Sequence, residues 1–296
     1  MSASVSVVII CYNRKKELEE CIFSILRQSV LPFEIIVVDN NSSDGTDQLF
    51  LQGAFKDLSF IIYEKLETNL GVAGGRNHAI RRASGDILLF LDDDAEISGD
   101  FAIQNVVARF AARPDVGVVA FKIINFFSRT ITKNEFPHIK LNNIDTEFET
   151  SYYVGAGHAI RSVVFDVCGY YPEHFFYGLE ELDLSVRIID REFKILYDPA
   201  ISIFHKKSTS GRLPNHQALS YTFRNRLLIS HKYFSKFNLL ILSILWFAKI
   251  ALVSRSVITP LRGIVEFIQA LPHERKYTLG PETVSRLKQL QGRIWY

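Results

Sequence analysis

Residues 87–94 read Ile-Leu-Leu-Phe-Leu-Asp-Asp-Asp and carry the strongest single indication of how this chain is built. The apolar run Ile87 to Leu91 predicts a buried strand, and three carboxylates follow it directly. Like charges this close repel unless a cation lies between them, and Mg²⁺ and Mn²⁺ favour carboxylate oxygens. If the chain stays extended, Asp92 and Asp94 point one way and Asp93 points the other way. The stretch therefore predicts either an Asp-x-Asp metal site at the carboxyl end of a strand, where open α/β sheets bind their ligands, or a solvated acidic turn.

The sequence before this stretch alternates between strand and helix patterns. Helical spacing of apolar residues follows the first predicted strand, and a Gly-rich segment at residues 71–77 opens a helix that runs to about Ala83. Such alternation at short spacing is typical of a doubly wound α/β domain with a parallel sheet. The predicted strands are Val5–Cys11, Phe33–Asp39, Leu58–Tyr63 and a fourth that starts at Gly85 and ends at the three Asp residues.

Several motifs follow one another in a fixed order along most of the chain. They are Val7–Arg14, Ile36–Thr46, Asn69–Asn77, Phe90–Asp94, Gly155–Asp166, Gly169–Phe176, Glu180–Arg187, His205 and Tyr221–Leu228. In this order they resemble the family 2 glycosyltransferases of the GT-A fold, and among these the bacterial cell-surface polysaccharide and rhamnosyltransferase-like members. The resemblance covers roughly residues 4–235. It implies the fold and the reaction class and says little about which sugar is moved.

The expected architecture is an α/β fold of the GT-A type. The resemblance implies a Rossmann-like, mostly parallel sheet flanked by helices, with a C-terminal helical extension. Residues 1–95 are predicted to form the nucleotide-sugar-binding half, residues 96–212 the acceptor-binding and catalytic half, and residues 213–296 a helical region that is basic and apolar. A chain of 296 residues is long enough to bury a full core as one large domain or two closely packed ones.

The metal site is predicted first. A glycosyltransferase must stabilise a departing nucleotide diphosphate, and a divalent cation that bridges its phosphates does so as a Lewis acid. Asp94 is the first choice for direct ligation, and Asp92 comes next, through water or the donor ribose. His205 follows the predicted strand Ile201–Phe204; the resemblance implies that it completes the metal site or bonds the diphosphate, and a structural histidine is the alternative. The expected cofactor is Mg²⁺ or Mn²⁺, with the nucleotide sugar as substrate.

The donor site is predicted at the same edge of the sheet. Asp39 ends the second strand beside the switch point, where a carboxylate can bond the base or ribose of the nucleotide; the resemblance gives it the same role, and a plain turn residue is the alternative. Arg76 and Asn77 lie at a helix start after a Gly-rich loop, which suits a phosphate or the donor sugar. The loop from Lys206 to Leu213 is a candidate lid. The remaining donor contacts are expected at Cys11, Tyr12, Asn13, Arg14, Asn41, Asn69, Gly75, Asp92, Asp93 and Lys206.

A second acidic cluster contains the candidate base. Glu181 aligns with the acid that serves as general base in the Glu-Asp motif of the family, with Glu in place of Asp, and Glu180 is the alternative. Asp183 is a third catalytic candidate, but it can also pair with Arg187 four residues along a helix. A carboxylate with a raised pKa would be better matched to proton transfer at neutral pH. Direct attack by the acceptor opposite the leaving group inverts the anomeric centre, as the resemblance also implies.

The charge of the chain is unevenly distributed. Residues 206–296 hold 15 Lys and Arg and three Glu, a net charge of +12, whereas the rest of the chain holds 19 basic and 29 acidic residues, a net charge of −10. A basic terminal region on an acidic body suggests an anionic surface as partner. No base-reading module accompanies the charge, so nucleic acid is not expected.

An apolar run, Leu239 to Val253, lies within the basic region and is flanked by Lys232, Lys236, Arg255 and Arg262. It is shorter than the roughly 20 residues that a membrane-spanning helix needs, and a lysine interrupts it. The sequence therefore favours an interfacial helix on an anionic leaflet, over a helix packed on protein and over a true span. We predict a cytoplasmic enzyme, peripheral on the inner face of the cell membrane, that can form a homo-oligomer.

The remaining features exclude little. The chain passes from Met1 straight into the first strand, so no signal peptide is expected. Cys11, Cys21 and Cys168 have no metal or disulfide spacing, which makes a reducing compartment the default. The expected substrates are a UDP- or dTDP-sugar and a glycan or lipid-linked acceptor whose pocket includes Gly155 to His158, although His158 can be a core residue. Alternatives are a nucleotidyltransferase, a sugar-nucleotide hydrolase or a non-catalytic binding module. No role is assigned to residues 125–150.

Overall fold

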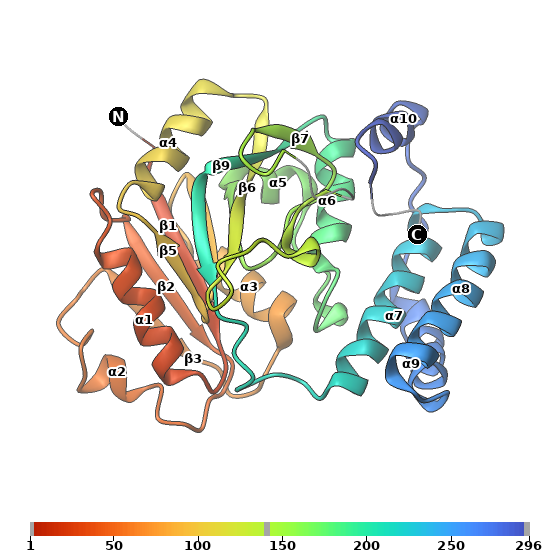
Figure 1. The fold of residues 1–296 in the computed structure, drawn as a ribbon, viewed down its shortest axis with the longest axis horizontal. Coiled ribbons are helices and arrows are strands. Elements are labelled where there is room, and N and C mark those ends of the chain that lie inside the picture. The colour runs from red at the N-terminus through yellow and green to blue at the C-terminus, as the bar shows by residue number, and fades with distance from the viewer. Residues whose placement is uncertain (1–2, 139–142, 293–296) are drawn as a thin grey trace.

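The computed structural model describes residues 3–138 and 143–292 of the chain. Its centre is a nine-stranded mixed sheet in the order β3-β2-β1-β4-β8-β6-β9-β5, with β7 paired to β9, and helices flank the sheet (Figure 1). The strands are β1 Val5–Cys11, β2 Glu34–Asp39, β3 Ile61–Lys65, β4 Ile87–Asp92, β5 Ala95–Ser98, β6 Val116–Asn125, β7 Phe148–Thr150, β8 Gly157–Arg161 and β9 Lys194–His205.

The helices alternate with strands at first and then follow one another at the C-terminus. The α-helices are α1 Lys15–Leu26, α2 Gln48–Leu51, α3 Gly71–Arg82, α4 Ala102–Ala112, α5 Ser162–Cys168, α6 Glu180–Asp190, α7 Asn215–Tyr233, α8 Lys236–Ser254, α9 Ile258–Ala270 and α10 Pro281–Gln289. Short 3₁₀ turns are η1 Lys133–Glu135, η2 Glu173–Phe175 and η3 Leu271–His273.

The apolar strands bury both faces of the sheet. Because successive side chains of a strand point to opposite faces, Val7 and Val8 of β1 belong to different cores. Val7 packs in the cluster that contains Leu18 of α1, and Val8 packs in the cluster that contains Ile80 of α3. Burial on two faces explains why these strands are apolar throughout rather than alternating.

The predicted parallel arrangement describes the first half of the sheet. β3, β2, β1 and β4 are parallel neighbours. Beyond β4 the sheet is mixed, because β8 enters antiparallel to both β4 and β6, and β5 and β7 are antiparallel to β9. The sheet continues without a break past residue 95, so the first two predicted regions share it and their division stays a prediction.

Several predicted strands have different bounds: β2 begins at Glu34 rather than Phe33, and β4 begins at Ile87 rather than Gly85. The third strand begins at Ile61 rather than at residue 58, because a turn with a hydrogen bond from the Ile61 N–H to the Leu58 carbonyl precedes it. The strand predicted over 201–204 is the last part of β9, which starts at Lys194. In the pairing of β6 with β9, Phe121 lies opposite Asp198 and Lys122 opposite Ser202, so residues 199–201 form a bulge in β9. Pro199 lacks an N–H, and a proline in the middle of an apolar run argues against one continuous strand when only the sequence is read.

One strand register brings distant residues to the same edge. β5 follows β4 directly and pairs antiparallel with β9, with Ala95 opposite His205. His205 is therefore adjacent to Asp94, although 111 residues separate them in sequence. The carboxyl ends of β1, β2 and β4 lie at this edge too, as the parallel pairing requires.

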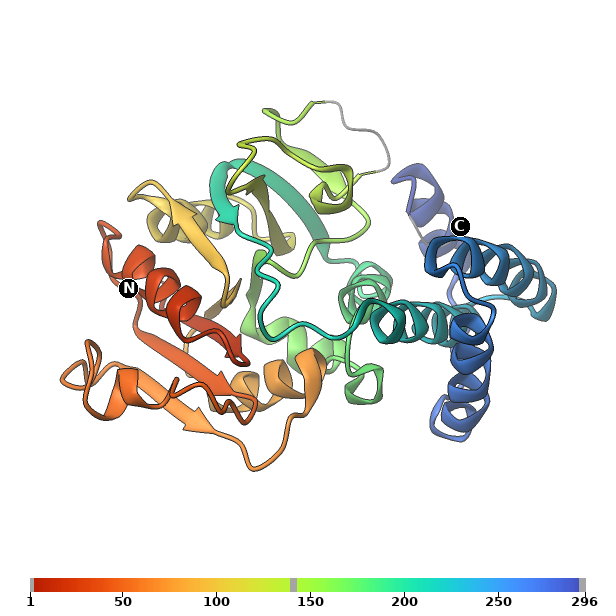
Figure 2. The same ribbon diagram turned by 60° about the horizontal axis from the view of Figure 1, so that its bottom comes forward.

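The C-terminal helices form a separate layer beside the sheet. α8 and α9 pack on α7, and α7 connects them to the sheet domain (Figure 2). α8 is long and apolar enough to cross a membrane by length and composition, with a mean hydropathy of 2.0 and 11% of its most apolar window buried.

Candidate active site

Asp92, Asp94 and His205 form a cluster at the carboxyl edge of the sheet. Each offers one ligand atom, and these atoms lie within 4.8 Å of one another. The chain turns at residues 93 and 94 instead of staying extended, yet Asp93 still points away from the cluster and receives hydrogen bonds from the Arg14 guanidinium at 2.5 Å and from the Tyr12 N–H at 3.3 Å. The three residues that the sequence assigned to a metal are thus brought together.

Cationic side chains compensate the charge of the three consecutive carboxylates. Arg14 lies 2.5 Å from an oxygen of Asp93 and 3.5 Å from an oxygen of Asp94, and Arg76 lies 3.3 Å from Asp92. Burial raises the pKa of Asp93 to about 7 despite the nearby Arg14. A solvated acidic turn is excluded for Asp93 and Asp94, because they are 3% and 1% exposed.

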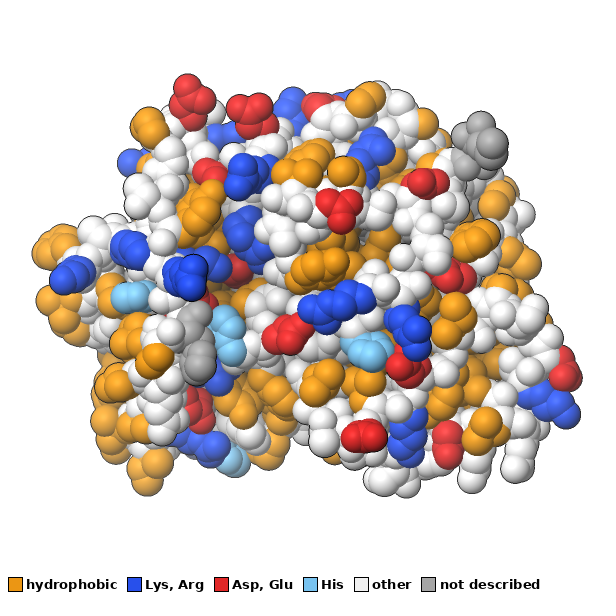
Figure 3. Space-filling model, turned by 180° about the vertical axis from the view of Figure 1, so that it is seen from behind, with side chains coloured by type: hydrophobic (Ala, Val, Ile, Leu, Met, Phe, Trp, Pro, Cys, Tyr) orange, Lys and Arg blue, Asp and Glu red, His pale blue; other side chains and the backbone are white. Residues whose placement is uncertain are grey.

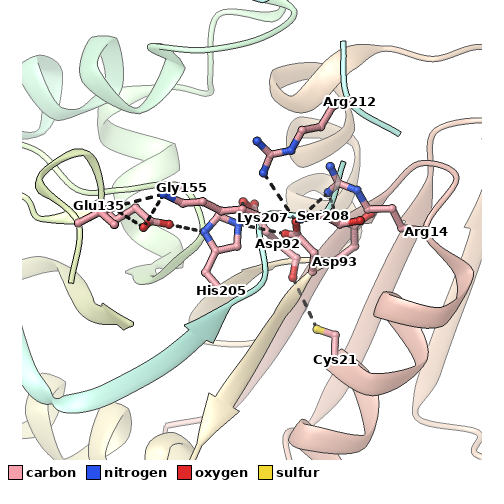
Figure 4. Close-up of polar contacts among 12 residues, drawn as sticks. Arg14, Cys21, Asp92, Asp93, Glu135, Gly155, His205, Lys207, Ser208 and Arg212 are labelled. Atoms are coloured by element: carbon pink, nitrogen blue, oxygen red, sulfur yellow. Dashed lines mark hydrogen bonds and ion pairs between the residues drawn. The ribbon is translucent and has the colours of Figure 1, made fainter. Parts of the chain in front are cut away.

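His205 lies between two carboxylates (Figure 4). Its Nε2 is 3.1 Å from Asp94 Oδ1, and its Nδ1 is 2.5 Å from Glu135 Oε1. Burial lowers the pKa of His205, but the bonds to Asp94 and Glu135 outweigh burial and raise the pKa to about 10. Glu135 lies in the segment to which the sequence assigned no role. Its only signal there was an acidic side chain within an irregular polar stretch.

Arg76 connects the two acidic clusters. Its guanidinium lies 2.7 Å from Glu181 Oε1 and 3.3 Å from Asp92 Oδ1, and it donates to the carbonyl of Gly155 at 3.1 Å. A side chain at Gly155 would place its Cβ 2.1 Å from the Glu181 carboxylate, so only glycine leaves room for this contact. The structure places Arg76 inside α3, which already begins at Gly71, rather than at a helix start after a loop, and the phosphate or sugar contact predicted for Arg76 stays a prediction.

Glu180 and Glu181 are neighbours in different environments. Glu180 is 2% exposed, and one of its oxygens has no hydrogen-bond partner among the described residues. Burial, and then the charge of Glu181, raises the pKa of Glu180 above its ordinary value, which favours its protonated form. Glu181 is less buried and is oriented by Arg76.

Asp183 is engaged in structural contacts. Its carboxylate accepts hydrogen bonds from Lys232 at 2.8 Å, from the Tyr233 hydroxyl at 2.8 Å and from Arg187 at 2.9 Å. The helix pairing with Arg187 that the sequence allowed is therefore present. With its side chain fully buried in these bonds, Asp183 is a poor candidate for a base.

The predicted donor residues surround the ends of β1 and β2. Asp39 is fully buried and accepts bonds from the Tyr63 hydroxyl at 2.6 Å and from the Ser42 N–H at 2.7 Å. Asn13 and Asn41 adopt left-handed backbone conformations, with φ of 52° and 68°. These turns place backbone and amide groups at the end of the parallel strands, where ligands bind.

Other predicted donor residues support the loops. Cys11 is a buried thiol, and the Asn69 side chain accepts a bond from the N–H of Gly71, which begins α3. Asn77 bonds both the N–H and the carbonyl of Tyr171. A Cβ on Gly75 would lie 2.7 Å from Ile10, so glycine allows α3 to approach β1 closely.

The loop from Lys206 to Leu213 covers the cluster. The Ser208 N–H donates to Asp94 at 2.8 Å, and Arg14 donates to the carbonyl of Ser210 at 2.6 Å. Gly211 has a φ of 64° and would bring a Cβ to 2.0 Å from the Tyr12 carbonyl. The Lys206 ammonium bonds Glu20 and Glu96, and the donor contact predicted for Lys206 stays a prediction.

His158 is a core residue. It is fully buried, stacks on Phe90 and contacts the Tyr171 hydroxyl at 3.3 Å. Burial, and then the charge of Arg76, lowers the pKa of His158 well below its ordinary value, so it is neutral.

Comparison with known proteins gives a consistent picture. Residues 6–169 match the family described as Glycosyl transferase family 2. An uncharacterized protein of Haemophilus influenzae is 36% identical over 172 residues, which are 57% of this chain and 92% of that protein. An O-antigen chain rhamnosyltransferase of Salmonella typhimurium is 25% identical over 70% of this chain and 68% of its own length.

Likeness in fold extends further along the chain. A mannosyltransferase from Pyrobaculum calidifontis, solved in complex with GDP-Man and Mn²⁺, superposes with a TM-score of 0.61. The superposition covers 98% of this chain and 79% of that protein at 18% identity, and it therefore speaks for the fold alone.

Proposed function

Because this chain belongs to glycosyl transferase family 2 and has the predicted GT-A fold, we propose that it is an inverting, metal-assisted glycosyltransferase. It moves a sugar from a UDP- or dTDP-linked donor to a hydroxyl of a glycan or lipid-linked acceptor. The observation that carries this proposal is Arg76, whose single guanidinium contacts both Asp92 of the candidate metal site and Glu181, the candidate base.

The donor set suits a hard divalent cation. Two carboxylates and one imidazole, already within 4.8 Å of one another, are ligands that Mg²⁺ and Mn²⁺ accept. Asp94, Asp92 and His205 would hold the ion, which would supply Lewis-acid stabilisation of the diphosphate. The mannosyltransferase of similar fold was solved with Mn²⁺, which supports this assignment by analogy of fold.

Glu181 acts as the general base. It takes the proton of the acceptor hydroxyl as the acceptor oxygen bonds to the anomeric carbon and the bond to the diphosphate breaks. The side chain of Glu180 is 3% exposed and that of Glu181 is 16% exposed, so Glu181 is the more accessible of the two carboxyl groups to an acceptor hydroxyl. Arg76 holds the Glu181 carboxylate at a fixed distance from Asp92, so that acceptor activation and leaving-group stabilisation occur at neighbouring points.

The nucleotide lies over the ends of β1 and β2. Asp39 and Asn41 bind the base and ribose, and Tyr12 to Arg14 line the same surface. Arg14 also balances the charge of Asp93 and Asp94 and contacts the loop that covers the site, so it is suited to hold that loop closed over the donor.

The acceptor belongs to the cell envelope. The rhamnosyltransferase to which the chain is similar acts on an O-antigen chain by its name, and the chain has a basic, apolar C-terminal region. We place the enzyme in the cytoplasm, on the inner face of the membrane, where lipid-linked glycans are extended.

A thermal-shift panel tests the donor and the metal together. UDP, dTDP and GDP are compared with and without Mn²⁺, because a ligand that binds only the native state raises the melting temperature. A shift by UDP or dTDP that requires Mn²⁺ supports the proposal. A shift by GDP alone would replace the donor class, and no shift by any nucleotide would contradict nucleotide-sugar use.

Product analysis tests the reaction itself. Transfer from the donor that the panel identifies should give a product of inverted anomeric configuration and should stop in excess EDTA. Release of free sugar without transfer would favour a sugar-nucleotide hydrolase. Full activity in excess EDTA would contradict the proposal that a metal ion assists the reaction.

A further inference from the structure

We propose that α8 and α9 together form a docking surface for an anionic bilayer, and that α7 connects this surface rigidly to the helix that carries Glu181. The proposal extends the single interfacial helix expected from the sequence to a two-helix unit. Only the part that concerns a lipid-linked acceptor rests on the proposed function; the docking of α8 and α9 on a bilayer does not.

The outer faces of both helices are apolar and exposed. In α8 the residues spaced at helical intervals include Phe237, Ile244 and Leu252, which are 68%, 62% and 79% exposed. The apolar face continues through the turn into α9, where Ile258 and Ile268 are 73% and 57% exposed. Hydrophobic side chains gather at this end of the molecule, on the left of the reversed view in Figure 3. A patch of this kind marks an interaction site rather than ordinary surface.

The inner faces of the same helices are already occupied. Leu242 and Ile250 of α8 are buried against Phe223 and Leu227 of α7. A helix that is apolar on all sides is normally surrounded by protein or lipid, and the described chain covers only one side. α7 covers the inner side of α8, so the outer side requires another apolar environment, such as lipid.

The charge of the hairpin favours an anionic lipid surface. Residues 236–270 contain four basic side chains and one acid, Glu266. Arg262 neutralises Glu266 at 2.8 Å. Lys236 and Arg255 mark the two ends of α8 and are exposed, so they can contact lipid head groups while the apolar face enters the interface. A second protein copy would bring a second set of like charges to the same face.

The packing of α8 disfavours a span. α8 has 19 residues, but Trp246 lies 4.2 Å below the Arg226 guanidinium of α7, and Lys249 lies 4.0 Å from the same ring. Crossing the bilayer would separate Trp246 from Arg226 and would pull the buried residues of α8 away from α7. Lying in the interface keeps all of these contacts.

α7 couples the hairpin to the catalytic helix α6. Asn225 donates to the carbonyls of Phe175 and Gly178 in the segment that leads into α6. Lys232 and Tyr233 bond Asp183, two residues after Glu181. A bilayer bound to α8 and α9 would therefore hold the acceptor side of the site at a fixed position relative to a lipid-linked substrate.

Co-sedimentation of the full chain with vesicles tests the docking. Vesicles of phosphatidylcholine are compared with vesicles that also contain phosphatidylglycerol, at low and high salt. We expect binding to the anionic vesicles only, weakened by salt. Leu252→Glu with Ile258→Glu should reduce binding at least about tenfold, since each charge enters the apolar interface. Lys236→Glu with Arg255→Glu should reduce it by a similar factor.

The control is Phe101→Glu, which places the same charge on an exposed aromatic residue at the start of α4. It should bind vesicles as the wild type does. Retention that resists salt and needs detergent would overturn the proposal in favour of a span, and a dimer without vesicle binding would overturn it in favour of a protein interface. Nucleotide-induced thermal shifts are measured on the same samples. Loss of docking with intact nucleotide binding therefore rejects only the docking surface, and the reverse result rejects only the proposed function.

A different observation carries a second inference. We infer that Glu135 is a positioning residue that orients His205 as a metal ligand. Both side chains are buried, and Glu135 Oε1 lies 2.5 Å from His205 Nδ1. Lys207 at 2.8 Å and the Thr132 hydroxyl at 2.6 Å hold the other oxygen of Glu135.

The geometry assigns the two ring nitrogens. With Nδ1 bonded to Glu135, Nε2 faces Asp94 and is the nitrogen left for a cation. Carboxylates that bond the outer nitrogen of a ligating histidine fix its tautomer and ring orientation, and their loss costs about 10–100-fold in metal affinity. Glu135→Ala removes this acceptor, whereas Glu135→Gln keeps a carbonyl oxygen for the Nδ1–H.

Mn²⁺ titration followed by electron paramagnetic resonance, with UDP present, tests this role. Glu135→Ala should weaken Mn²⁺ binding by about 10–100-fold, and Glu135→Gln should restore most of the affinity. The control is Glu147→Ala, since Glu147 is an exposed acid paired with Arg109. A folded Glu135→Ala variant with wild-type Mn²⁺ affinity, or one that loses only thermal stability, would overturn the inference. Absence of Mn²⁺ binding by the wild type would overturn both this role and the metal assistance.

Discussion

The carboxyl edge of the sheet buries charged side chains, whereas the α8–α9 hairpin exposes apolar ones. Asp94 and Arg76 are 1% and 4% exposed, while Leu252 and Ile258 are 79% and 73% exposed. Both arrangements cost folding free energy if nothing else contacts the side chains. The difference teaches that the two proposals rest on opposite kinds of surface, a charged site proposed for the substrate with its cation and an apolar face proposed for the bilayer.

Within the charged region, every buried ion has a counter-ion. Arg14, Arg76 and His205 each contact at least one of the three consecutive Asp residues. Buried ion pairs of this kind add little net stability but are costly to leave half-made. The hairpin has no such internal compensation on its outer face.

The largest effect is expected at Asp94. The proposal is that the buried charges at the sheet edge bind the cation. Asp94→Ala removes one proposed ligand and also the hydrogen-bond partner of His205. Loss of several kcal/mol of charge stabilisation corresponds to a rate decrease on the order of 10⁴-fold. Nucleotide affinity should lose its dependence on Mn²⁺, and vesicle binding should be unchanged. Steady-state assays measure the transfer rate, and thermal shifts measure the Mn²⁺ dependence of nucleotide binding. A variant that keeps Mn²⁺-dependent nucleotide binding would contradict the assignment of Asp94 as a ligand.

The next effect separates the two adjacent acids. Glu181→Gln keeps the size and the contact with Arg76 but cannot accept a proton, so transfer should fall by roughly 10²–10⁴-fold while donor binding survives. Glu180→Gln replaces the more deeply buried of the two carboxyl groups, which is not the proposed base, and should cost much less. Single-turnover assays with both variants measure this difference. An inactive Glu180→Gln with an active Glu181→Gln would move the base by one residue.

A smaller effect is expected inside the hairpin, on stability alone. Ile250 is 2% exposed, so Ile250→Ala should lower the free energy of unfolding by about 2–5 kcal/mol. Urea unfolding in lipid-free buffer measures this loss.

The smallest effect is expected on the outer face of the same helix. Leu252→Ala should change the free energy of unfolding by less than about 0.5 kcal/mol, because the Leu252 side chain is exposed and its removal leaves no cavity. Equal destabilisation by Ile250→Ala and Leu252→Ala would mean that protein covers the outer face in solution, and would remove the contrast between the two regions.

Local patterns in the sequence located most of the fold. The parallel strands, the three Asp residues at a strand end and the helix on which Asp183 can pair with Arg187 were all predicted, because apolar periodicity and side-chain spacing are properties of neighbouring residues. The motif order supplied the family resemblance. The apolar run at 239–253 likewise marked α8, though not its partner α9.

Tertiary structure alone decided which of these residues meet. Glu135 and His205 are 70 residues apart, and Arg76 and Glu181 are 105 apart. Such contacts depend on how distant elements pack together, as does the β5–β9 register that places His205 beside Asp94. The ion pairs of Lys206 have the same origin, because Glu20 and Glu96 come from other elements. Periodicity within a short window contains no information about which distant residues pair. The sequence by itself therefore determined the elements and the candidate residues. The packing of the whole chain determined which of these residues contact one another.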